Sequence, residues 1–417
     1  MKINLAKSIE SFHLLVCLLV VSVLAAVNVR AADTWVGNTS PNWNTAANWS
    51  PTSVPVASDQ LSFISAGTAG TTLTNDLAAG TVFNGLTFQS GGSAFTFSGN
   101  SIGLNGGITN SGAGAQVISN AIALSANGTV NAAGPVTLGG PISGAGNLTK
   151  LGTSTLTLSG ANSYAGSLFI NAGTVKATAV GALETTNPIV FTGAATATLD
   201  IQGTAQTVTN LVFTNIGSST ITITGTAGSA LTTSPAALVL CPFSVTNSLT
   251  LNMSGLSSFI YNNGSGTVTA SLGTGGNGPV GIPASGSETV TLASTTNFIT
   301  AGTVSVGTCS PASGIDTSTV NLGTNNTLDV GTITLGNGRG GGTVQFASGI
   351  TNGTLRIAGA TGGSSTATLN LGSHDSTSAS DKPVDVIDTT PGTLNAQLGS
   401  VTIAKLATPS PWPPTVA

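Results

Sequence analysis

The chain has 417 residues, of which 56 are glycine, and only 5% of its residues are charged and 5% aromatic. An average globular domain carries about 25% charged residues and about 7% glycine, so this composition is unlike that of most enzymes. Disorder is also excluded, because disordered chains are rich in charge, whereas this one has a mean hydropathy of +0.36 and many β-branched residues. Such residues are typical of stacked strands joined by tight glycine turns.

Residues 1–31 have the parts of an export signal. Lys2 and Lys7 precede the apolar run LLVCLLVVSVLAAV at residues 14–27, and "VRA" ends at Ala31 with small residues at the signal-peptidase positions. The run is shorter than the about 20 residues that a membrane helix requires. We therefore predict cleavage after Ala31, secretion or display at the cell surface, and no transmembrane segment in the mature chain. A retained membrane anchor is the alternative.

The mature chain would keep six basic and twelve acidic residues. Nucleic-acid affinity comes mainly from Lys and Arg contacts with phosphate, which six scattered basic residues cannot supply. Binding to an anionic membrane surface is excluded for the same reason.

The segment after the signal is rich in tryptophan. Three of the four tryptophans, Trp35, Trp43 and Trp49, lie between residues 33 and 63. If the rest of the chain forms a stacked β-rod, its open end has unpaired strand edges that a bulky terminal segment covers. We predict that residues 32–75 form this cap. Tryptophan faces also stack on flat partners such as sugar rings, so a glycan-contacting platform is the alternative.

From about Val82 onward, short β-rich runs alternate with Gly, Asn and Ser. In STLTLS, Leu156 and Leu158 fall on one face of the strand and the threonines on the other, which is the period of a strand with one face in a core. No segment beyond the signal has a sustained helical period. The predicted fold is therefore all-β.

The tripeptide Gly-Thr-Val repeats along the chain. It begins at Gly80, Gly128, Gly173, Gly266, Gly302 and Gly342. The first three intervals are 48, 45 and 93 residues, which fits one, one and two units of about 46, each made of two coils of about 23 residues. We predict roughly fifteen stacked coils over residues 76–405, a rod of about 70 Å, and a proline-rich tail at residues 406–417.

Two cysteines, Cys241 and Cys309, remain after export. Their separation of 68 residues corresponds to about three coils, or roughly 14 Å of rod. A disulfide requires Cα atoms within about 7 Å. We expect two free thiols unless a loop brings the residues together.

The stretch GAGNLTKLGTSTLTLSGANSYAGSLFINAGTVKA at residues 144–177 resembles the autotransporter-associated β-strand repeat. The matching positions are Lys150, Gly152, Leu156, Leu158, Gly160, Asn162, Tyr164, Gly166, Asn171 and Gly173. Looser versions cover residues 34–214, and TWVG...NWNTAANW resembles the N-terminal segment of large exported bacterial proteins that bear these repeats. The resemblance implies an exported, right-handed parallel β-helix. Within this stretch we expect the leucines to build the core and the glycines to make the corners.

The C-terminal sequence departs from this family. Autotransporters end in a membrane barrel of alternating strands, whereas this chain ends in KLATPSPWPPTVA. We therefore expect a passenger-type protein without the autotransporter barrel, exported by another system, or a shortened relative or piece of a longer protein.

Parallel β-helices include polysaccharide-cleaving enzymes, which need two carboxylates about 5 to 9.5 Å apart. Asp316 and Asp329 lie 13 residues apart, and Asp200 has only Glu184 near it in the sequence. Neither spacing places two carboxylates on one strand face or at equivalent positions of neighbouring coils. A pair formed in space among Asp316, Asp329 and Glu288 would indicate such an enzyme. We predict no catalysis, no cofactor and no metal.

Two further stretches carry groups that could take part in chemistry. The consecutive Ser-His-Asp at residues 373–375 cannot act as a triad on a strand, because neighbouring side chains point to opposite faces. Asp381, Asp385 and Asp388 could hold calcium, but a solvated loop is the favoured interpretation. GNGRGG at residues 336–341 matches a dinucleotide-binding pattern, yet a strand follows it where a helix is required.

Thr-x-Thr pairs also recur. They begin at Thr155, Thr196, Thr207, Thr220, Thr267, Thr289, Thr332 and Thr366. A flat threonine array repeated once per coil would bind an ordered surface such as ice or crystalline polysaccharide. Because the intervals range from 11 to 47 residues, we do not expect a single aligned face.

These observations predict an exported parallel β-helical repeat protein that acts as a structural or adhesive rod. Its expected partners are extracellular polysaccharide or cell-surface components. The alternative is a polysaccharide-binding or polysaccharide-cleaving β-helix.

Overall fold

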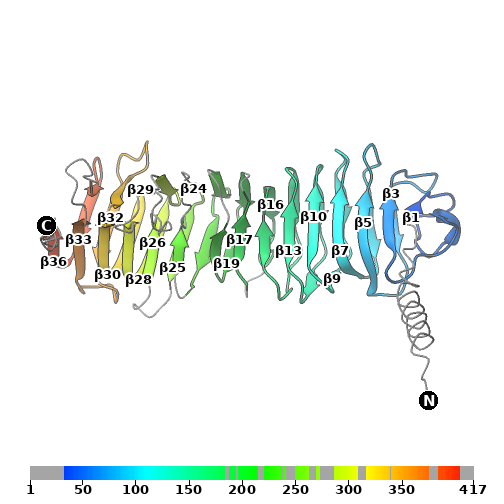
Figure 1. Cartoon of the computed structure of the whole chain (residues 1–417), viewed down its shortest axis with the longest axis horizontal. Helices are drawn as coiled ribbons and strands as arrows, with labels where there is room; N and C mark the ends of the chain where they lie inside the picture. Colours follow the sequence, from blue (N-terminus) through cyan, green and yellow to red (C-terminus); the bar gives the residue numbers. More distant parts are fainter. Residues whose placement is uncertain are drawn as a thin grey trace, which may run out of the picture.

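A computed structural model of the chain describes residues 32–183, 187–193, 196–214, 220–235, 238–240, 249–262, 269–272, 286–308, 316–338, 340–374 and 384–403. It is an elongated rod of stacked strands (Figure 1). The helical content of these residues is one 3-10 turn, η1 (Ala46–Asn48). None of their helices is long and apolar enough to cross a membrane. The predicted signal and proline-rich tail lie outside the described residues.

The strands form three sheets, which we call A, B and C. Sheet A contains β1 (Asp33–Trp35), β2 (Trp49–Ser50), β3 (Gln60–Phe63), β5 (Thr81–Phe88), β7 (Ile102–Asn110), β9 (Ile122–Leu124), β10 (Gly128–Ala132), β12 (Ile142–Gly144), β13 (Leu148–Leu151), β15 (Leu168–Ile170), β17 (Ile189–Thr192) and β20 (Leu211–Thr214). Sheet B contains β4 (Thr72–Asn75), β6 (Thr96–Gly99), β8 (Gln116–Ile118), β11 (Val136–Leu138), β14 (Thr155–Leu158), β16 (Gly173–Ala177), β18 (Ala197–Asp200), β21 (Thr220–Thr224), β24 (Leu249–Gly255), β27 (Gly286–Thr291), β29 (Asp316–Leu322), β31 (Gly340–Phe346) and β34 (Val386–Asp388). Sheet C contains β19 (Ala205–Val208), β22 (Ala230–Thr233), β23 (Leu238–Leu240), β25 (Ser258–Asn262), β26 (Thr269–Leu272), β28 (Thr296–Thr308), β30 (Asn325–Gly338), β32 (Thr354–Ala358), β33 (Ala367–His374), β35 (Thr393–Ala396) and β36 (Leu398–Ile403).

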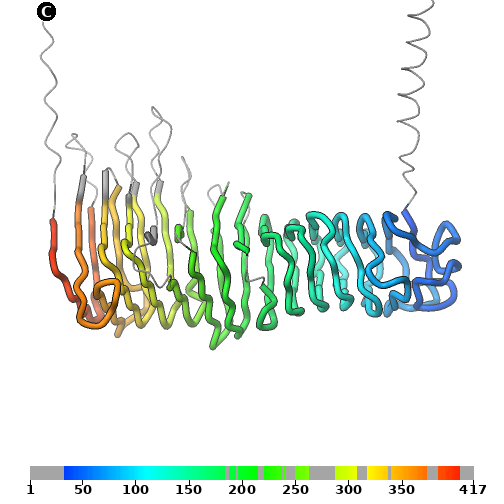
Figure 2. Tube along the Cα trace, turned by 90° about the horizontal axis from the view of Figure 1, so that it is seen from below, coloured from blue at the N-terminus to red at the C-terminus, as the bar shows by residue number. Residues whose placement is uncertain are grey.

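Each circuit of the chain adds one strand to sheet B, parallel to the strand of the circuit before it. The successive circuits follow one another along the rod (Figure 2). Sheet B has 13 strands, so at about 4.8 Å per strand it extends about 60 Å along the rod. Of the strand pairs in the described residues, β1 with β2 is the single antiparallel one. The predicted all-β parallel β-helix is therefore confirmed.

The interior is built from rows of apolar side chains in register. The row on sheet A runs through Leu148, Leu168, Ile189 and Leu211. The row on sheet B runs through Leu156, Val175, Leu199 and Ile223. All eight side chains are buried. Because strand side chains alternate between faces, register without slippage keeps each row inside, and each such side chain stabilises the fold by about 1.5–3 kcal/mol.

The length of a coil differs between two regions of the rod. In residues 116–177, which we call the narrow coils, Gly128 pairs with Leu148 and Leu148 with Leu168, so a coil takes 20 residues. In residues 286–374, which we call the wide coils, Thr296 pairs with Asn325 and Asn325 with Thr354, so a coil on sheet C takes 29 residues. The extra length goes into longer strands and loops.

The Gly-Thr-Val tripeptides do not mark equivalent positions. Gly128 begins β10 of sheet A, whereas Gly173 begins β16 of sheet B and Gly302 lies within β28 of sheet C. The predicted unit of about 46 residues is therefore wrong. A glycine followed by two β-branched residues suits the start of a strand on any of the three sheets, so the tripeptide does not measure the coil.

The N-terminal end of the rod is closed by the residues before β3. β1 lies parallel to β3, and β2 pairs with β1 on its outer side as the last strand of sheet A. Asn42 bridges to Thr74 and covers the outer edge of sheet B. β3 and β4 already pair with strands of the next coil, so the cap is shorter than the predicted residues 32–75.

The other end of the described chain is more open. Leu394, Val401 and Ile403 on the last strands of sheet C are 44%, 50% and 70% exposed. Val401 pairs with Leu369, whose side chain is buried, so an inward-facing row continues to the last strand.

Candidate functional site

Lys150 of the repeat motif points into the rod from β13 and is fully buried. Its Nζ donates hydrogen bonds to the carbonyl oxygens of Leu151, Gly152 and Ala172, at 2.8, 2.7 and 3.1 Å. Burial lowers the pKa of this ammonium to about 8. All three ammonium donors are used on backbone carbonyls, so Lys150 joins one coil to the next and is not available to a ligand.

The motif glycines allow the coils to approach closely. Gly152 has a φ of +75°, and a Cβ added there would lie 2.5 Å from the carbonyl oxygen of Ala132 in the preceding coil. Gly160 and Gly166 are required by space alone, since an added Cβ would lie 2.3 Å from the carbonyl oxygens of Gly140 and Gly146. Gly173 begins β16. These positions are corners, as expected.

The remaining motif residues also pack between coils. Leu156, Leu158 and Tyr164 are fully buried. Asn162 accepts a hydrogen bond from the Ile142 N–H at 2.9 Å and donates to the Ala182 carbonyl at 2.6 Å, which joins it to the coils on both sides. The backbone N–H of Asn171 donates to the carbonyl oxygen of Lys150 at 3.1 Å. The motif thus gives a stacking unit and no reactive site.

The three tryptophans predicted to cap the rod or to contact a glycan are all buried. Trp35 and Trp43 have no exposed surface and Trp49 is 1% exposed. Trp43 packs edge-on against Trp49, with ring centroids 6.0 Å apart, and against Phe97 of the first coils, at 5.1 Å. No indole face is open to a sugar ring. A glycan platform built from Trp35, Trp43 and Trp49 is therefore wrong, and their packing suits a cap.

Asp329 and Glu288 lie on different sheets, whereas the backbone of Asp316 pairs with Gly286 on the strand that carries Glu288. Asp329 on β30 of sheet C forms an ion pair with Arg356 on β32, at 2.5 Å. Glu288 faces inward on β27 of sheet B and accepts a hydrogen bond from Ser318 at 2.9 Å. The side chains of Asp316 and Glu184 lie outside the described residues.

Asp200 lies on the outer face of sheet B. It is 3.9 Å from the ammonium of Lys176 and accepts hydrogen bonds from the side chain and backbone of Gln202. The carboxylate therefore has cationic and amide partners in its own and the neighbouring coil.

The charge-dense segment near the C-terminus is partly described. Asp385 accepts a hydrogen bond from the Gly342 N–H at 2.9 Å, and Asp388 accepts two from Thr390, which lower the pKa of that carboxyl. Asp375 and Asp381 lie outside the described residues, as do Cys241 and Cys309. In the part of the chain that the structure describes, no three His, Cys, Asp or Glu side chains gather as metal ligands.

The GNGRGG stretch joins two strands. Gly336 lies in β30, and β31 begins at Gly340, so the element that follows is a strand, as predicted. This context does not fit a dinucleotide-binding turn, which must open a helix.

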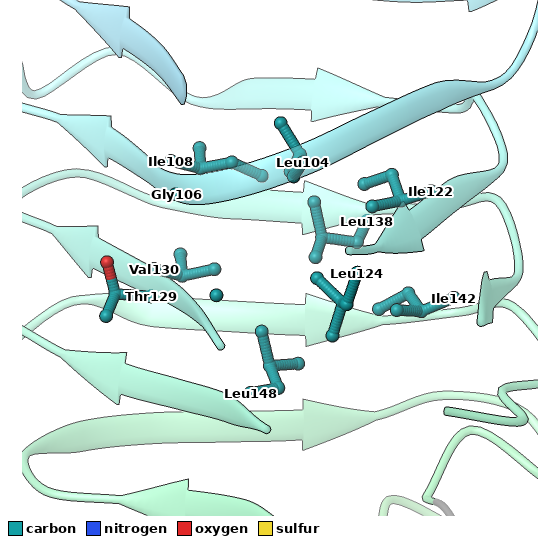
Figure 3. Close-up of a pocket in the computed structure, with 11 residues that line it drawn as sticks. Leu104, Gly106, Ile108, Ile122, Leu124, Thr129, Val130, Leu138, Ile142 and Leu148 are labelled. Carbon is teal, nitrogen blue, oxygen red and sulfur yellow. The ribbon is translucent and has the colours of Figure 1, made fainter. Parts of the chain in front are cut away.

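A cavity lies inside the rod, where the narrow coils meet the coil before them (Figure 3). Its volume is about 10 Å³, and its walls are aliphatic side chains such as Leu124, Leu138 and Leu148. A buried water needs about 10–15 Å³ and polar partners, so this is a packing void and not a ligand site.

The Thr-x-Thr pairs are divided between two sheets, yet the pairs that begin at Thr220 and Thr289 on sheet B lie in register. One outward row of sheet B runs through Thr220, Thr250, Thr289, Thr319 and Thr343 on five consecutive coils. Two residues further along the same strands, a second row runs through Thr222, Asn252, Thr291, Asn321 and Gln345. We call these ten residues the polar array.

The sequence did not predict this aligned face, because the loops between the strands differ in length. Loops of different size between the strands make the intervals in sequence irregular but leave the register of the strands intact. Thr207 and Thr332 lie on sheet C, and Thr267 lies outside the described residues. A search for Thr-x-Thr also missed strands that end the pattern with Asn or Gln. A search for Thr followed two residues later by Thr, Asn or Gln would have found all five strands.

Comparison with known proteins agrees with the repeat geometry. Residues 148–177 match the family model described as passenger-associated-transport-repeat. These residues run from β13 to β16 and include the buried lysine, the corner glycines and the paired leucines. No curated protein and no solved structure matches the chain. The chain therefore carries an autotransporter passenger-type repeat within a parallel β-solenoid.

Proposed function

We propose that this protein is an exported rod, at the cell surface or outside the cell, with an adhesive or structural role and no catalysis. The observation that carries the proposal is the use of the motif side chains. The side chains of Lys150 and Asn162 form hydrogen bonds with backbone groups of their own and neighbouring coils, and the leucines fill the core. The repeat maintains a long shape, and passenger-type repeats belong to proteins carried to the cell exterior.

Polysaccharide cleavage is the competing function. It requires two carboxylates on either side of a bound sugar. The pairing of Asp329 with Arg356 and the inward position of Glu288 count against their use on a substrate in a lateral groove.

The location is tested by treating intact cells that make the full chain with a protease. Digestion of the chain in intact cells, with a cytoplasmic marker left whole, is the expected result. Protection of the chain until the cells are broken would contradict export.

The activity is tested with the purified chain of residues 32–417 and a panel of insoluble polysaccharides. We expect no sugar in the supernatant and retention of the protein on at least one pellet. Sugar release that disappears in the Asp316→Ala, Asp329→Ala double variant would overturn the proposal in favour of an enzyme.

A further inference from the structure

We propose that the polar array on sheet B is the adhesive face of the rod and that it binds the ordered surface of an insoluble, uncharged polysaccharide. The inference rests on the proposed function and names the partner. Strands β24 and β29, which carry part of the array, are labelled in Figure 1. Three of its five strands, β27, β29 and β31, belong to the wide coils, and β21 and β24 come before them.

The array is a two-dimensional lattice. Neighbouring coils place equivalent side chains about 4.8 Å apart along the rod, and the two rows lie about 6.6 Å apart across it. Five coils and two rows give ten side chains on one face of one sheet. A lattice of this kind matches a partner that repeats in two dimensions, and a single small molecule would contact only a corner of it.

The chemistry of the array favours a neutral partner rich in hydroxyl groups. Its ten side chains are threonine, asparagine and glutamine, and none carries a charge. Hydroxyl and amide groups both donate and accept hydrogen bonds, as sugar hydroxyls do. An acidic polymer would require Lys or Arg on this face. Among the described residues, Lys176 is the one cation on the outer face of sheet B in the narrow coils. It lies outside the array and is paired with Asp200.

Side-chain hydrogen bonds hold part of the array in place before any partner arrives. Asn321 donates to the hydroxyl of Thr291 at 3.2 Å, and Gln345 donates to the amide oxygen of Asn321 at 3.0 Å. Threonine is stiff at χ1 because it is β-branched. Groups that are already ordered lose little entropy on binding, so many weak contacts can add up to retention on a surface.

A protein partner fits this face less well. The centres of protein interfaces are rich in aromatic residues, methionine and arginine, which carry most of the binding energy. The array contains none of these. It is also a sheet face and not a hollow, whereas small ligands bind in concave sites. An extended, flat, hydroxylated surface is the partner that remains.

The test compares matched charge variants on two faces of the same rod. Thr250→Lys with Thr319→Lys places two ammonium groups within the array, two coils apart. Thr87→Lys with Thr149→Lys places two on the outer face of sheet A, where the threonines are also partly exposed. A third variant, Thr250→Val with Thr289→Val and Thr319→Val, removes hydroxyls but keeps the side-chain shape. Circular dichroism and thermal unfolding confirm that each purified variant of residues 32–417 is folded.

The probes are microcrystalline cellulose and crystalline chitin, with retention measured by sedimentation. We expect wild-type retention on at least one of them, about tenfold weaker apparent affinity for the array lysine variant, and about threefold weaker affinity for the valine variant. The sheet A variant should stay within about twofold of wild type.

Several outcomes would overturn the inference and leave the proposed rod standing. Equal retention of wild type and both array variants would show that another face binds. A polysaccharide partner would be excluded if the wild-type protein reaches the cell surface but stays in solution with both polysaccharides. It would also be excluded if the protein partitions only into growing ice. Equal affinity for soluble cello-oligosaccharides would show that no ordered surface is needed. Failure of the proposed function itself would instead appear as protection from protease in intact cells.

Discussion

The narrow and the wide coils stack in the same way but treat buried polar groups differently. In the narrow coils a single buried ammonium, Lys150, serves three carbonyl oxygens around one corner. In the wide coils Asn297 and Asn326 occupy equivalent inward positions of neighbouring coils, and Asn297 donates to Asn326 at 2.9 Å. Asn326 in turn donates to the carbonyl oxygens of Gly323 and Thr354. Buried amides also occur in the narrow coils, where Asn120 donates to the carbonyl oxygens of Ser98 and Asn100. The wide coils differ in that two buried amides of neighbouring coils bond to each other.

Individual turns of the rod also differ in how tightly they are packed. An added Cβ at Gly152 in the narrow coils would meet a backbone carbonyl, while at Gly349 in the wide coils it would meet nothing within 4 Å, although φ is positive at both. Close corners also occur in the wide coils, where a Cβ added at Gly323 would lie 2.1 Å from the carbonyl oxygen of Ala293. The tightness therefore belongs to the individual corner and not to the length of the coil.

The largest expected effect comes from Gly152→Ala. The substitution adds left-handed backbone strain and a contact of 2.5 Å with the Ala132 carbonyl oxygen, so we expect a loss of about 4 kcal/mol of unfolding free energy. Gly349→Ala adds the strain alone and should cost about 1 kcal/mol. Urea unfolding measures both. Equal losses would show that the contact at Gly152 adds nothing to the strain of its backbone.

Next in size is Asn326→Leu in the wide coils. The change removes the donor to two buried carbonyl oxygens and the acceptor for Asn297, so we expect a loss of about 3 kcal/mol. Asn325→Ala on the same strand is the control. Asn325 is exposed, and its loss should cost less than about 0.5 kcal/mol in the same unfolding experiment. A small effect for Asn326→Leu would argue against the amide ladder.

A pH dependence should mark the narrow coils. The pKa of Lys150 is lowered to about 8 in the fold from 10.5, so between these values the folded chain has released a proton that the unfolded chain still binds. Stability should therefore rise by about 2 kcal/mol from pH 7.5 to 9.5 and stay flat below pH 7. The two tyrosines of the chain also titrate at high pH. Subtracting the stability of Lys150→Met from that of wild type at each pH removes their contribution and leaves that of Lys150. Parallel stability curves for the two proteins would refute it.

The smallest effects are expected for ion pairs on the outside. Asp329→Asn breaks a short pair with the one-third-exposed Arg356 in the wide coils and should cost about 1 kcal/mol. Lys176→Gln breaks the longer and more exposed pair with Asp200 and should cost less than about 0.5 kcal/mol. Thermal unfolding in low and in 1 M salt checks the assignment, because high salt should reduce the difference for each variant. A larger loss for Lys176→Gln would reverse the order.

The strand character of residues 148–177 could be predicted from the sequence because the information is local. Leu156 and Leu158 alternate with threonines, and this period alone places the leucines inside. The corner glycines and the buried Lys150 belong to a recognisable repeat. The position of Lys150, by contrast, required the fold, since a lysine in a sequence is most often a surface residue.

The coil length and the polar array could not be predicted in this way. Gly-Thr-Val occurs on all three sheets, so its spacing in sequence mixes different corners of the coil. The rows of the array are separated in sequence by loops of unequal length, which hide the register. The tryptophans allowed two interpretations, and burial decided between them.

The sequence by itself determined an all-β repeat with leucines inside and glycines at the corners. It could do so because alternation and turn chemistry act over a few residues. Tertiary structure alone decided which residues face one another across coils. The pairing of Thr250 with Thr289, 39 positions apart, and the closing of the rod by Trp43 depend on how each circuit returns onto the last. That return depends on the whole length of every coil, which no short stretch of sequence contains.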